Sequence, residues 1–338
     1  MAASIDIATP VVRWQAVHGR NHLPWQQTRD PYRVWLSEIM LQQTQVATVL
    51  DYYPRFLARF PDVAALAAAP ADDVLALWSG LGYYSRARNL HRCAQQVMAQ
   101  HGGAFPRTAA VLATLPGIGR STAGAIAAFC FSERVPILDA NVRRVLTRVL
   151  GFGEDLAVAR NERLLWEQAE ALLPRERLGE AMPRYTQGLM DLGAAVCVPR
   201  APRCEACPLQ APCAARRAGD MERYPVRTRK LSRRAESWWL LLRRNAAGAF
   251  WLERRPSTGI WAGLYCPPVS PQPPLAEGAG VQHLAPFTHV LTHRDLHLHP
   301  VLVSEPQGTG VGWYGAAEWP GLGLPAPVRK LLESISQN

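Results

Sequence analysis

Residues 115–128 read Leu-Pro-Gly-Ile-Gly-Arg-Ser-Thr-Ala-Gly-Ala-Ile-Ala-Ala. Gly117 and Gly119 permit a tight turn, and the small residues after them let a second helix approach closely. Such a turn points backbone amides outward at a helix N-terminus, where a phosphate can bind without base-specific contacts. The same pattern is also common as a plain connection between helices, so phosphate binding is one of two interpretations.

Helical periodicity surrounds this turn and covers most of residues 1–220. Several prolines fall between the apolar segments, where they do not interrupt a helix. The pattern predicts helices over Ile7–His18, Tyr32–Phe60, Val63–Ser79, Ser85–His101, Ala109–Leu115, Ser121–Phe131, Asn141–Leu150 and Asn161–Leu173.

The character of the sequence changes near residue 220. A basic run that ends in Arg233-Arg234 predicts an exposed linker over residues 221–234. Alternating and β-branched stretches beyond it predict an α+β domain over residues 235–338. Its expected elements are strands over Trp238–Arg243, Phe250–Arg254 and Leu296–Ser304, and a helix over Ala326–Ser334.

The formal net charge is +10, and nearly all basic residues are arginine, with Lys230 and Lys330 as the only lysines. A basic excess of this size favours nucleic acid or a membrane surface as partner, although a genome that prefers arginine would give the same count. No apolar run is long enough to span a bilayer, and the first nine residues do not resemble a secretory signal. These features predict a cytoplasmic protein that does not associate with a membrane.

Four cysteines follow the pattern Cys197-x6-Cys204-x2-Cys207-x5-Cys213. A cytosolic chain keeps such thiols reduced, which argues against disulfides. Four thiolates at this spacing can bind zinc or a [4Fe–4S] cluster. Spacing alone favours zinc slightly, because zinc sites are the more frequent.

Two carboxylates stand beside apolar sequence. Desolvation of Glu38, within Val34–Leu41, would raise its pKa toward neutrality and make it a general acid. Glu38, Gln42 and Gln45 also have the spacing of a solvated helix face, and the pattern alone favours that interpretation. Asp139 precedes a predicted helix and by itself is best interpreted as its N-cap. One protonated and one charged carboxylate are nevertheless what cleavage of a glycosidic bond needs.

Taken in order along the chain, Glu38, the hairpin, Asp139 and the cysteines resemble the endonuclease III and MutY superfamily of helix-hairpin-helix DNA glycosylases. The resemblance covers residues 10–220 and implies a [4Fe–4S] cluster, not zinc, on Cys197, Cys204, Cys207 and Cys213. The implied fold is multidomain, with an all-α glycosylase domain that carries the cluster loop and an α+β Nudix-like C-terminal domain. Within the first domain it implies a six-helix and hairpin subdomain over about 23–135 and an iron–sulfur subdomain from 1–22 and 136–220.

Two long stretches, Trp35–Val46 and Trp78–Arg88, are most similar to the MutY family. This resemblance implies that Glu38 protonates adenine at N7, that Asp139 stabilises the oxocarbenium ion, and that Asn141 helps to hold the water and the sugar. Gln43 and Tyr83 match residues that wedge into the duplex while the adenine is flipped out. The DNA- and substrate-binding residues implied in this domain are Trp25, Gln42, Gln43, Tyr83, Gly117, Gly119, Ser121 and Gln187.

Position 121 separates two branches of the superfamily. Bifunctional relatives of endonuclease III place a Schiff-base lysine directly after the hairpin, where this sequence has Ser121. Residues 1–220 contain no lysine, and a lysine-dependent lyase step needs an amine nucleophile. A monofunctional glycosylase is therefore expected. Ala140 departs from the family, which has glycine after the aspartate, but it removes no group that the reaction requires.

The stretch Trp251–Tyr265 resembles the Nudix-like domain of MutY. A Nudix hydrolase needs several glutamates soon after it, and between Leu264 and Val290 the only acid is Glu277, so binding is expected instead of hydrolysis. The family reads 8-oxoguanine through a Phe-Ser-His loop, which here becomes Leu291-Thr-His293. The predicted lesion contacts are His289, Thr292 and His293, and the missing aromatic leaves the preference for 8-oxoguanine over guanine open.

These features together predict an enzyme that removes adenine mispaired with 8-oxoguanine or guanine in double-stranded DNA. We expect a monomer in a bacterial-type cytoplasm, associated with the nucleoid. One alternative is a bifunctional endonuclease III-like glycosylase and lyase that acts on oxidised pyrimidines. Another is a non-catalytic iron–sulfur DNA-binding protein, and a third is a Nudix phosphohydrolase.

Overall fold

The computed structural model describes residues 5–228, 232–274, 280–305 and 308–336. Backbone contacts divide the chain into two compact units. The first comprises the described residues of 1–49 and 96–230, and the second those of 50–95 and 231–338. The boundaries predicted at 220 and 235 follow composition, and they stay predictions, with part of the linker outside the described residues. Within the described ranges, no helix has the length and apolar character to cross a membrane.

The first unit is helical. N-caps begin several of its helices. Asp30 accepts a hydrogen bond from the Tyr32 amide at 2.9 Å at the start of the helix Pro31–Leu41, and Thr108 accepts from the Val111 amide at the start of the helix Ala109–Leu112. Its α-helices are α1 (Ala8–His18), α2 (Pro31–Leu41), α7 (Ala109–Leu112), α8 (Arg120–Phe131), α9 (Ala140–Leu150), α10 (Ala159–Ala171), α11 (Leu178–Ala195) and α12 (Ala214–Ala218). Its 3-10 turns are η1 (Pro24–Gln26), η2 (Cys204–Ala206) and η3 (Met221–Arg223).

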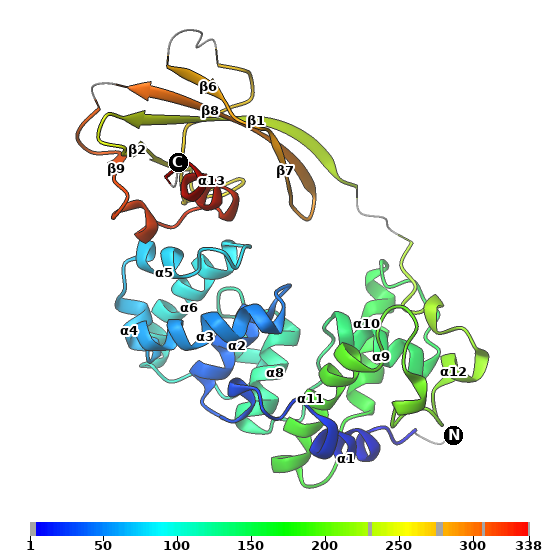
Figure 1. Ribbon diagram of the computed structural model, residues 1–338. Helices are drawn as coiled ribbons and strands as arrows, with labels where there is room; N and C mark the ends of the chain where they lie inside the picture. The colour runs from blue at the N-terminus through cyan, green and yellow to red at the C-terminus, as the bar shows by residue number, and fades with distance from the viewer. Residues whose placement is uncertain (1–4, 229–231, 275–279, 306–307, 337–338) are drawn as a thin grey trace. The chain divides into compact units, whose positions relative to one another are not determined.

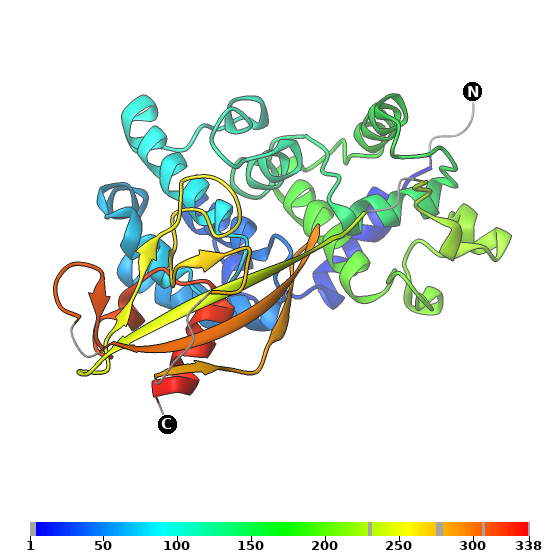
Figure 2. The ribbon, with the colours of Figure 1, turned by 90° about the horizontal axis from the view of Figure 1, so that it is seen from above.

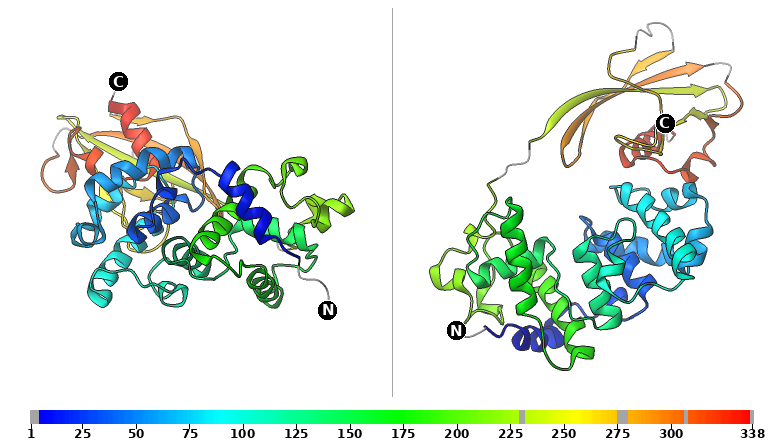
Figure 3. Two further views of the ribbon diagram at one scale, coloured as in Figure 1. Left: turned by 90° about the horizontal axis from the view of Figure 1, so that it is seen from below. Right: turned by 180° about the vertical axis from the view of Figure 1, so that it is seen from behind.

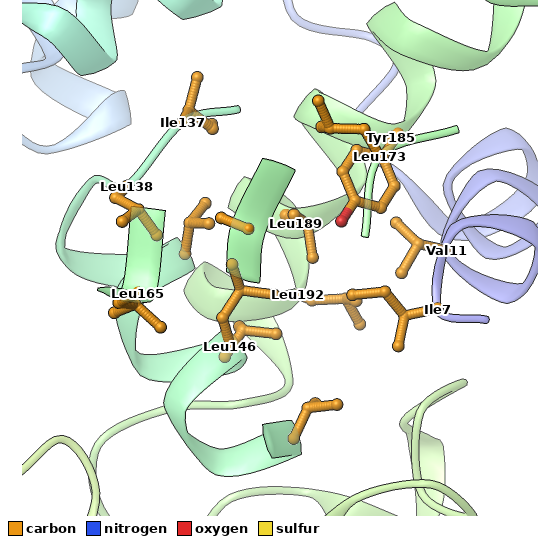
Figure 4. Close-up of a cluster of buried hydrophobic side chains, with 14 of the residues drawn as sticks. Ile7, Val11, Ile137, Leu138, Leu146, Leu165, Leu173, Tyr185, Leu189 and Leu192 are labelled. Carbon is orange, nitrogen blue, oxygen red and sulfur yellow. The ribbon is translucent and has the colours of Figure 1, made fainter. Parts of the chain in front are cut away.

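An apolar core joins α11 to α1 and α9, which the views in Figure 3 show gathered together. Figure 4 shows the core side chains, including Val11 from α1, Leu146 from α9 and Leu192 from α11. Gly188 permits the contact with α1, because a Cβ there would lie 2.6 Å from Val11 Cγ1. Leu138 belongs to the same core and is the residue before Asp139, so packing fixes the start of α9.

The helical part of the second unit contains α4 (Val63–Ala68) and α5 (Ala71–Leu77), with most of α3 (Val46–Arg59) and α6 (Ser85–His101). Phe56 and Trp78 are buried and meet edge to face at 6.0 Å. This part is bonded to the C-terminal segment: Ser79 Oγ and Tyr84 OH both donate to the Leu324 carbonyl, at 2.9 and 2.7 Å.

The C-terminal part of the second unit is a sheet of order β6-β8-β1-β2-β9, with β5 on β1 and β7 on β8. Figures 1 and 2 show the long strands β1 and β8 side by side, paired in parallel from Arg234↔Arg294 to Asn245↔Glu305, and α13 against one face of the sheet. The elements are β1 (Arg234–Asn245), β2 (Phe250–Trp251), β3 (Glu253–Arg254), β4 (Tyr265–Cys266), β5 (Val269–Ser270), β6 (Val281–His283), β7 (Phe287–Val290), β8 (Arg294–Glu305), β9 (Trp313–Tyr314), η4 (Trp319–Gly321) and α13 (Ala326–Ser336).

The structure differs from the predicted elements at several places, among them the strand predicted over Phe250–Arg254, which is the two short strands β2 and β3. The helix predicted over Tyr32–Phe60 is two helices, because α2 ends at Leu41 and α3 begins at Val46. The helix predicted over Val63–Ser79 is broken before Pro70, which cannot continue it. The long helix α11 was not predicted as an element, because Pro183 and its glycines weaken the periodic pattern.

Candidate active site and cysteine loop

A pocket of about 240 Å³ lies in the first unit and has Glu38 in its wall. Trp25 of η1 and Glu38 of α2 are among its lining residues, with Gln187 of α11. This volume is below the roughly 300–1,000 Å³ of sites for drug-sized ligands, and it suits one flat heterocycle. The other lining residues are Gln15, Asn21, Gln26, Thr28, Arg29, Val34, Ser37, Phe129, Glu180, Pro183 and Arg184.

Glu38 is half-buried in this wall, between fully buried neighbours of α2. Desolvation and, second, the charge of Asp139 raise the pKa of Glu38 from 4.5 to about 8. Because α2 ends at Leu41, Gln42 and Gln45 do not continue its helical face, and the interpretation as one solvated face is wrong. A carboxyl with this pKa is protonated at neutral pH and can donate a proton to a ligand in the pocket.

Asp139 is the N-cap of α9, as its position predicted: Oδ1 accepts from the Val142 amide at 2.6 Å. Burial raises the pKa of Asp139, while the Val142 and Asn141 amides and the Arg144 and Arg143 charges oppose the rise. The cap therefore gives the carboxylate a fixed orientation. Ser121 also supports this segment, since its Oγ accepts from the Leu138 amide at 3.1 Å.

Asn141 is held between α9 and α11. Its Oδ1 accepts from Arg144 Nη2 at 2.8 Å, and Arg144 also donates to the carbonyl oxygens of Gly193, at 2.6 Å, and Cys197, at 2.7 Å. A Cβ on Gly193 would lie 2.6 Å from Asn141 Cβ and 3.0 Å from its backbone carbon and oxygen. Glycine at position 193 thus allows Asn141 to sit where it does.

We expect Gly193→Ala to displace Asn141 and to lower the predicted glycosylase activity at least about tenfold, with a loss of about 1–3 kcal/mol in unfolding free energy from overpacking. Gly179→Ala, in the same helix, is the matched control, because a Cβ there meets no atom within 4 Å. Single-turnover rates and thermal unfolding of the two variants provide the comparison. Equal rates for both would show that the close approach does not set the position of Asn141.

Other predicted residues of the first unit lie close to this site or to the hairpin. Gln42 Nε2 donates to Thr122 Oγ1 at 3.4 Å, next to Ser121 in α8. Gly117 has φ +78°, a conformation that favours glycine, so the turn requires it. A Cβ on Gly119, the N-cap of α8, would meet nothing within 4 Å, so this position is open to an approaching group.

Two residues predicted to wedge into DNA have left-handed backbones. Gln43, in the break between α2 and α3, has φ +57°, and Tyr83, before α6, has φ +47°. Residues other than glycine adopt this conformation at a cost of about 1 kcal/mol or more, and such strain gathers at functional sites. Both side chains are exposed, that of Tyr83 to 44%.

The predicted lesion contacts divide into two groups. Thr292 and His293 are exposed in the turn between β7 and β8, and the hydroxyls of Thr292 and Tyr83 are hydrogen-bonded at 3.1 Å. His289 lies instead within β7, half-buried and 6.0 Å from the Trp261 ring, and desolvation lowers its pKa. Thr292 is therefore better placed than His289 to meet a ligand.

The four predicted cysteine ligands line one small cavity, and residues of α9 form part of its wall. The Cys207 thiol has its pKa raised to about 11, by burial first and also by the Cys197, Cys213 and Cys204 sulfurs. Arg148 closes one side, where its guanidinium donates to Cys197 Sγ at 3.4 Å and to the Val198 carbonyl at 2.7 Å. In the described part of the chain, no three Cys, His, Asp or Glu side chains are close enough for one metal ion.

Sequence reasoning missed polar residues that line the pocket or support it from behind: Gln15 lines it, and Asp191 bonds the lining residue Gln187. Asp191 is fully buried and accepts from Arg20 Nε at 2.7 Å and from Gln187 Nε2 at 3.0 Å. Gln15 is also buried and donates from Nε2 to Asn21 Oδ1 at 2.6 Å. A charged or amide side chain inside an otherwise apolar helical pattern, as at Asp191 in α11, was the available signal.

Two families match parts of the chain. Residues 36–170 match the HhH-GPD superfamily base excision DNA repair protein, and residues 238–334 match the NUDIX domain. The adenine DNA glycosylase of Buchnera aphidicola (subsp. Acyrthosiphon pisum, strain APS) is 35% identical over 97% of each chain. The adenine DNA glycosylase of Homo sapiens is 42% identical over 60% of this chain and 38% of its own length.

Solved structures resemble the helical region. A thermostable thymine-DNA glycosylase has a TM-score of 0.54 and 28% identity over 62% of this chain and 95% of its own. An endonuclease III in a non-covalent DNA complex has a TM-score of 0.52 and 20% identity, over 63% of this chain and 94% of its own. The endonuclease III likeness shows the fold alone.

Proposed function

Because the chain belongs to the adenine DNA glycosylases, base excision repair enzymes that hydrolyse N-glycosyl bonds, we propose that it removes adenine paired with 8-oxoguanine or guanine, as a monofunctional enzyme. The observation that carries the proposal is the pair of carboxyl groups in the first unit. Glu38 has a pKa of about 8 partly because of Asp139, so the two groups interact electrostatically, and Glu38 carries the proton at neutral pH.

In the proposed reaction, an adenine flipped out of the duplex enters the pocket lined by Trp25 and Glu38. Glu38 donates its proton to adenine N7, which weakens the bond from the base to the sugar. The Asp139 carboxylate, fixed by its cap, stabilises the positive charge that develops on the sugar. Asn141 helps to hold the sugar and the water that completes hydrolysis.

The same pocket supports glycosylase chemistry without a lyase step. Ser121 takes the place where bifunctional relatives carry lysine, and its hydroxyl is engaged by the Leu138 amide. Residues 1–220 have no lysine amine to form a Schiff base. The expected product is therefore an abasic site in an intact strand.

We further propose that the loop at Thr292 senses the base opposite the adenine. Its exposed hydroxyl can donate and accept hydrogen bonds, and its contact with Tyr83 links it to a residue proposed to wedge into DNA. The domain that carries it matches the NUDIX domain, and no group suited to a metal ion occurs among its described residues. Glu277, the acid that sequence analysis singled out, lies outside the described residues.

Thr292→Ala is expected to lower the preference for 8-oxoguanine over guanine about five- to tenfold, as the loss of one hydrogen bond would. Excision rates on the two duplexes, measured at fixed salt, give this ratio. Thr288→Ala is the control, because Thr288 is also an exposed residue of this region but bonds His297. An unchanged ratio in Thr292→Ala would place opposite-base recognition elsewhere.

We also propose that Cys197, Cys204, Cys207 and Cys213 hold a [4Fe–4S] cluster. The four thiols line one cavity, and four cysteine thiolates are the ligand set of a [4Fe–4S] cluster. When bound, such a cluster would tie Cys197, two residues after the end of α11, to the three later cysteines and so brace the loop that carries Arg200 and Arg203. Arg148 would neutralise part of its negative charge, since it already donates to Cys197 Sγ.

The purified protein should be brown and contain about four iron atoms per chain. Cys204→Ser should lose most of this iron, whereas Cys93→Ala, at a buried cysteine outside the loop, should keep it. Metal analysis and visible absorption spectra of the wild-type protein and the two variants measure the iron content. A colourless protein with one zinc ion per chain would refute the cluster.

A further inference from the structure

Three glutamines line the pocket of the first unit, and two of them, Gln187 and Gln26, differ in how their side-chain amides are held. Gln187 Nε2 donates to Asp191 Oδ1 at 3.0 Å, one helical turn further along α11. Asp191 also accepts from Arg20, through the backbone amide at 3.0 Å and through Nε at 2.7 Å. The Asp191 side chain is only 1% exposed, so its carboxylate relies on these protein donors instead of water.

The charge of Asp191 dictates how the Gln187 amide is turned. A carboxylate in an ion pair has only acceptor sites, so the end of Gln187 that faces it must be the amino group. A flipped Gln187 would set its carbonyl oxygen against the carboxylate, with repulsion in a buried site. The Gln187 carbonyl oxygen is therefore the end left to the pocket.

We propose that Asp191 is a positioning residue that sets base specificity by locking Gln187 as an acceptor for the 6-amino group of adenine. The inference rests on the function proposed above and extends it. Adenine carries a hydrogen-bond donor at position 6, whereas hypoxanthine and guanine carry an acceptor oxygen there. A locked acceptor favours the amino base and repels the oxo bases, because two acceptors would face each other.

Gln26 shows why the lock matters. In the part of the chain that the structure describes, its side-chain nitrogen and oxygen are both buried without a hydrogen-bond partner, and the residue lines the pocket. A free amide can turn over and present either a donor or an acceptor to a base. Gln26 can thus bind amino and oxo bases alike, and discrimination requires the amide that cannot turn.

Asp191→Asn tests the lock with almost no change of shape. The Arg20 backbone amide is fixed, whereas its side chain is 31% exposed and can swing away. The asparagine oxygen is therefore expected to stay with the backbone amide. Its amino group then faces Gln187, which must turn its own amino group into the pocket.

The experiment measures single-turnover excision of adenine, of hypoxanthine and of unsubstituted purine from otherwise identical duplexes. In Asp191→Asn, the adenine-to-hypoxanthine rate ratio should fall roughly ten- to a hundredfold, and the adenine-to-purine ratio should fall as well. Arg20→Lys is the control, because it alters the ion pair but keeps the carboxylate, so both ratios should persist. A merely structural role of Asp191 would slow all three bases equally.

Gln187→Ala provides a second route to the same result. It removes the acceptor directly and should lower the adenine-to-purine ratio as Asp191→Asn does, and the double variant should lower it no further. Unchanged ratios in Asp191→Asn, or additive effects in the double variant, would overturn the inference. If the wild-type chain releases no adenine at all, the proposed function fails instead, so the two failures are distinguishable.

Discussion

Asp139→Asn should reduce adenine excision roughly a thousandfold or more while duplex binding and folding stay nearly unchanged. Asparagine is as good an N-cap as aspartate, so the bond from the Val142 amide can persist and α9 should still begin at Ala140. The substitution removes only the negative charge that would stabilise the cationic sugar. Single-turnover excision and equilibrium binding to the same duplex separate the two effects.

The N-cap of another helix supplies the control. Asp62 caps α4, where it accepts from the Ala65 amide at 2.8 Å, and it has no place in the proposed site. Asp62→Asn should retain full excision. Substantial activity in Asp139→Asn would mean that the carboxylate serves only as a cap and that its assigned role in the reaction is wrong.

Glu38→Gln should lower excision by about 10² to 10⁴, the usual contribution of a general acid. The pH profile gives a sharper result, because burial and Asp139 raise the pKa of Glu38 to about 8. The reactive form combines protonated Glu38 with ionised Asp139, so the rate should fall as pH rises through about 8. It should also fall at the acidic end of the range, because burial raises the pKa of Asp139 and protonation removes its charge. Single-turnover rates from pH 5 to 10, at constant ionic strength, measure the profile.

The two possible origins of that profile are separable. In Glu38→Gln the remaining slow reaction should lose its dependence on pH near 8, since no proton leaves the amide there. A wild-type rate that already falls above pH 5 would show an ordinary, ionised glutamate and would contradict the assignment. Binding affinity should vary little over the range in which the rate changes.

Local patterns predicted elements that depend on local chemistry. α6 spans Ser85–His101 as predicted, and α8 begins within one residue of the predicted start, directly after Gly119. The break between α2 and α3 could not be predicted, because it places Gln43 in a left-handed conformation that local preference opposes. In the sequence, the helical pattern continues through this break without interruption.

In the site, too, features that depend on local sequence were predictable, whereas those that depend on distant residues were not. The cap formed by Asp139 was predictable from its position before a helix, and the apolar neighbours of Glu38 indicated the desolvation that raises its pKa. The second cause of that rise, the charge of Asp139, comes from about a hundred residues later in the chain and required the fold. α11 escaped prediction because Gly188 and Gly193 resemble helix breakers, yet close contacts with α1 and with Asn141 require them. Asp191 was missed for a different reason, because only the folded chain brings Arg20 to it.

If Glu38 and Asp139 act as proposed, the protein excises adenine without cutting the strand. The most direct measurement uses a labelled duplex with adenine opposite 8-oxoguanine, scored for strand scission with and without alkali, beside a duplex with thymine opposite the adenine. Cleavage is expected at the adenine only after alkali, strongest opposite 8-oxoguanine and absent in Asp139→Asn. Alkali-independent nicking by the wild-type chain, or nicking that persists in Asp139→Asn, would contradict it.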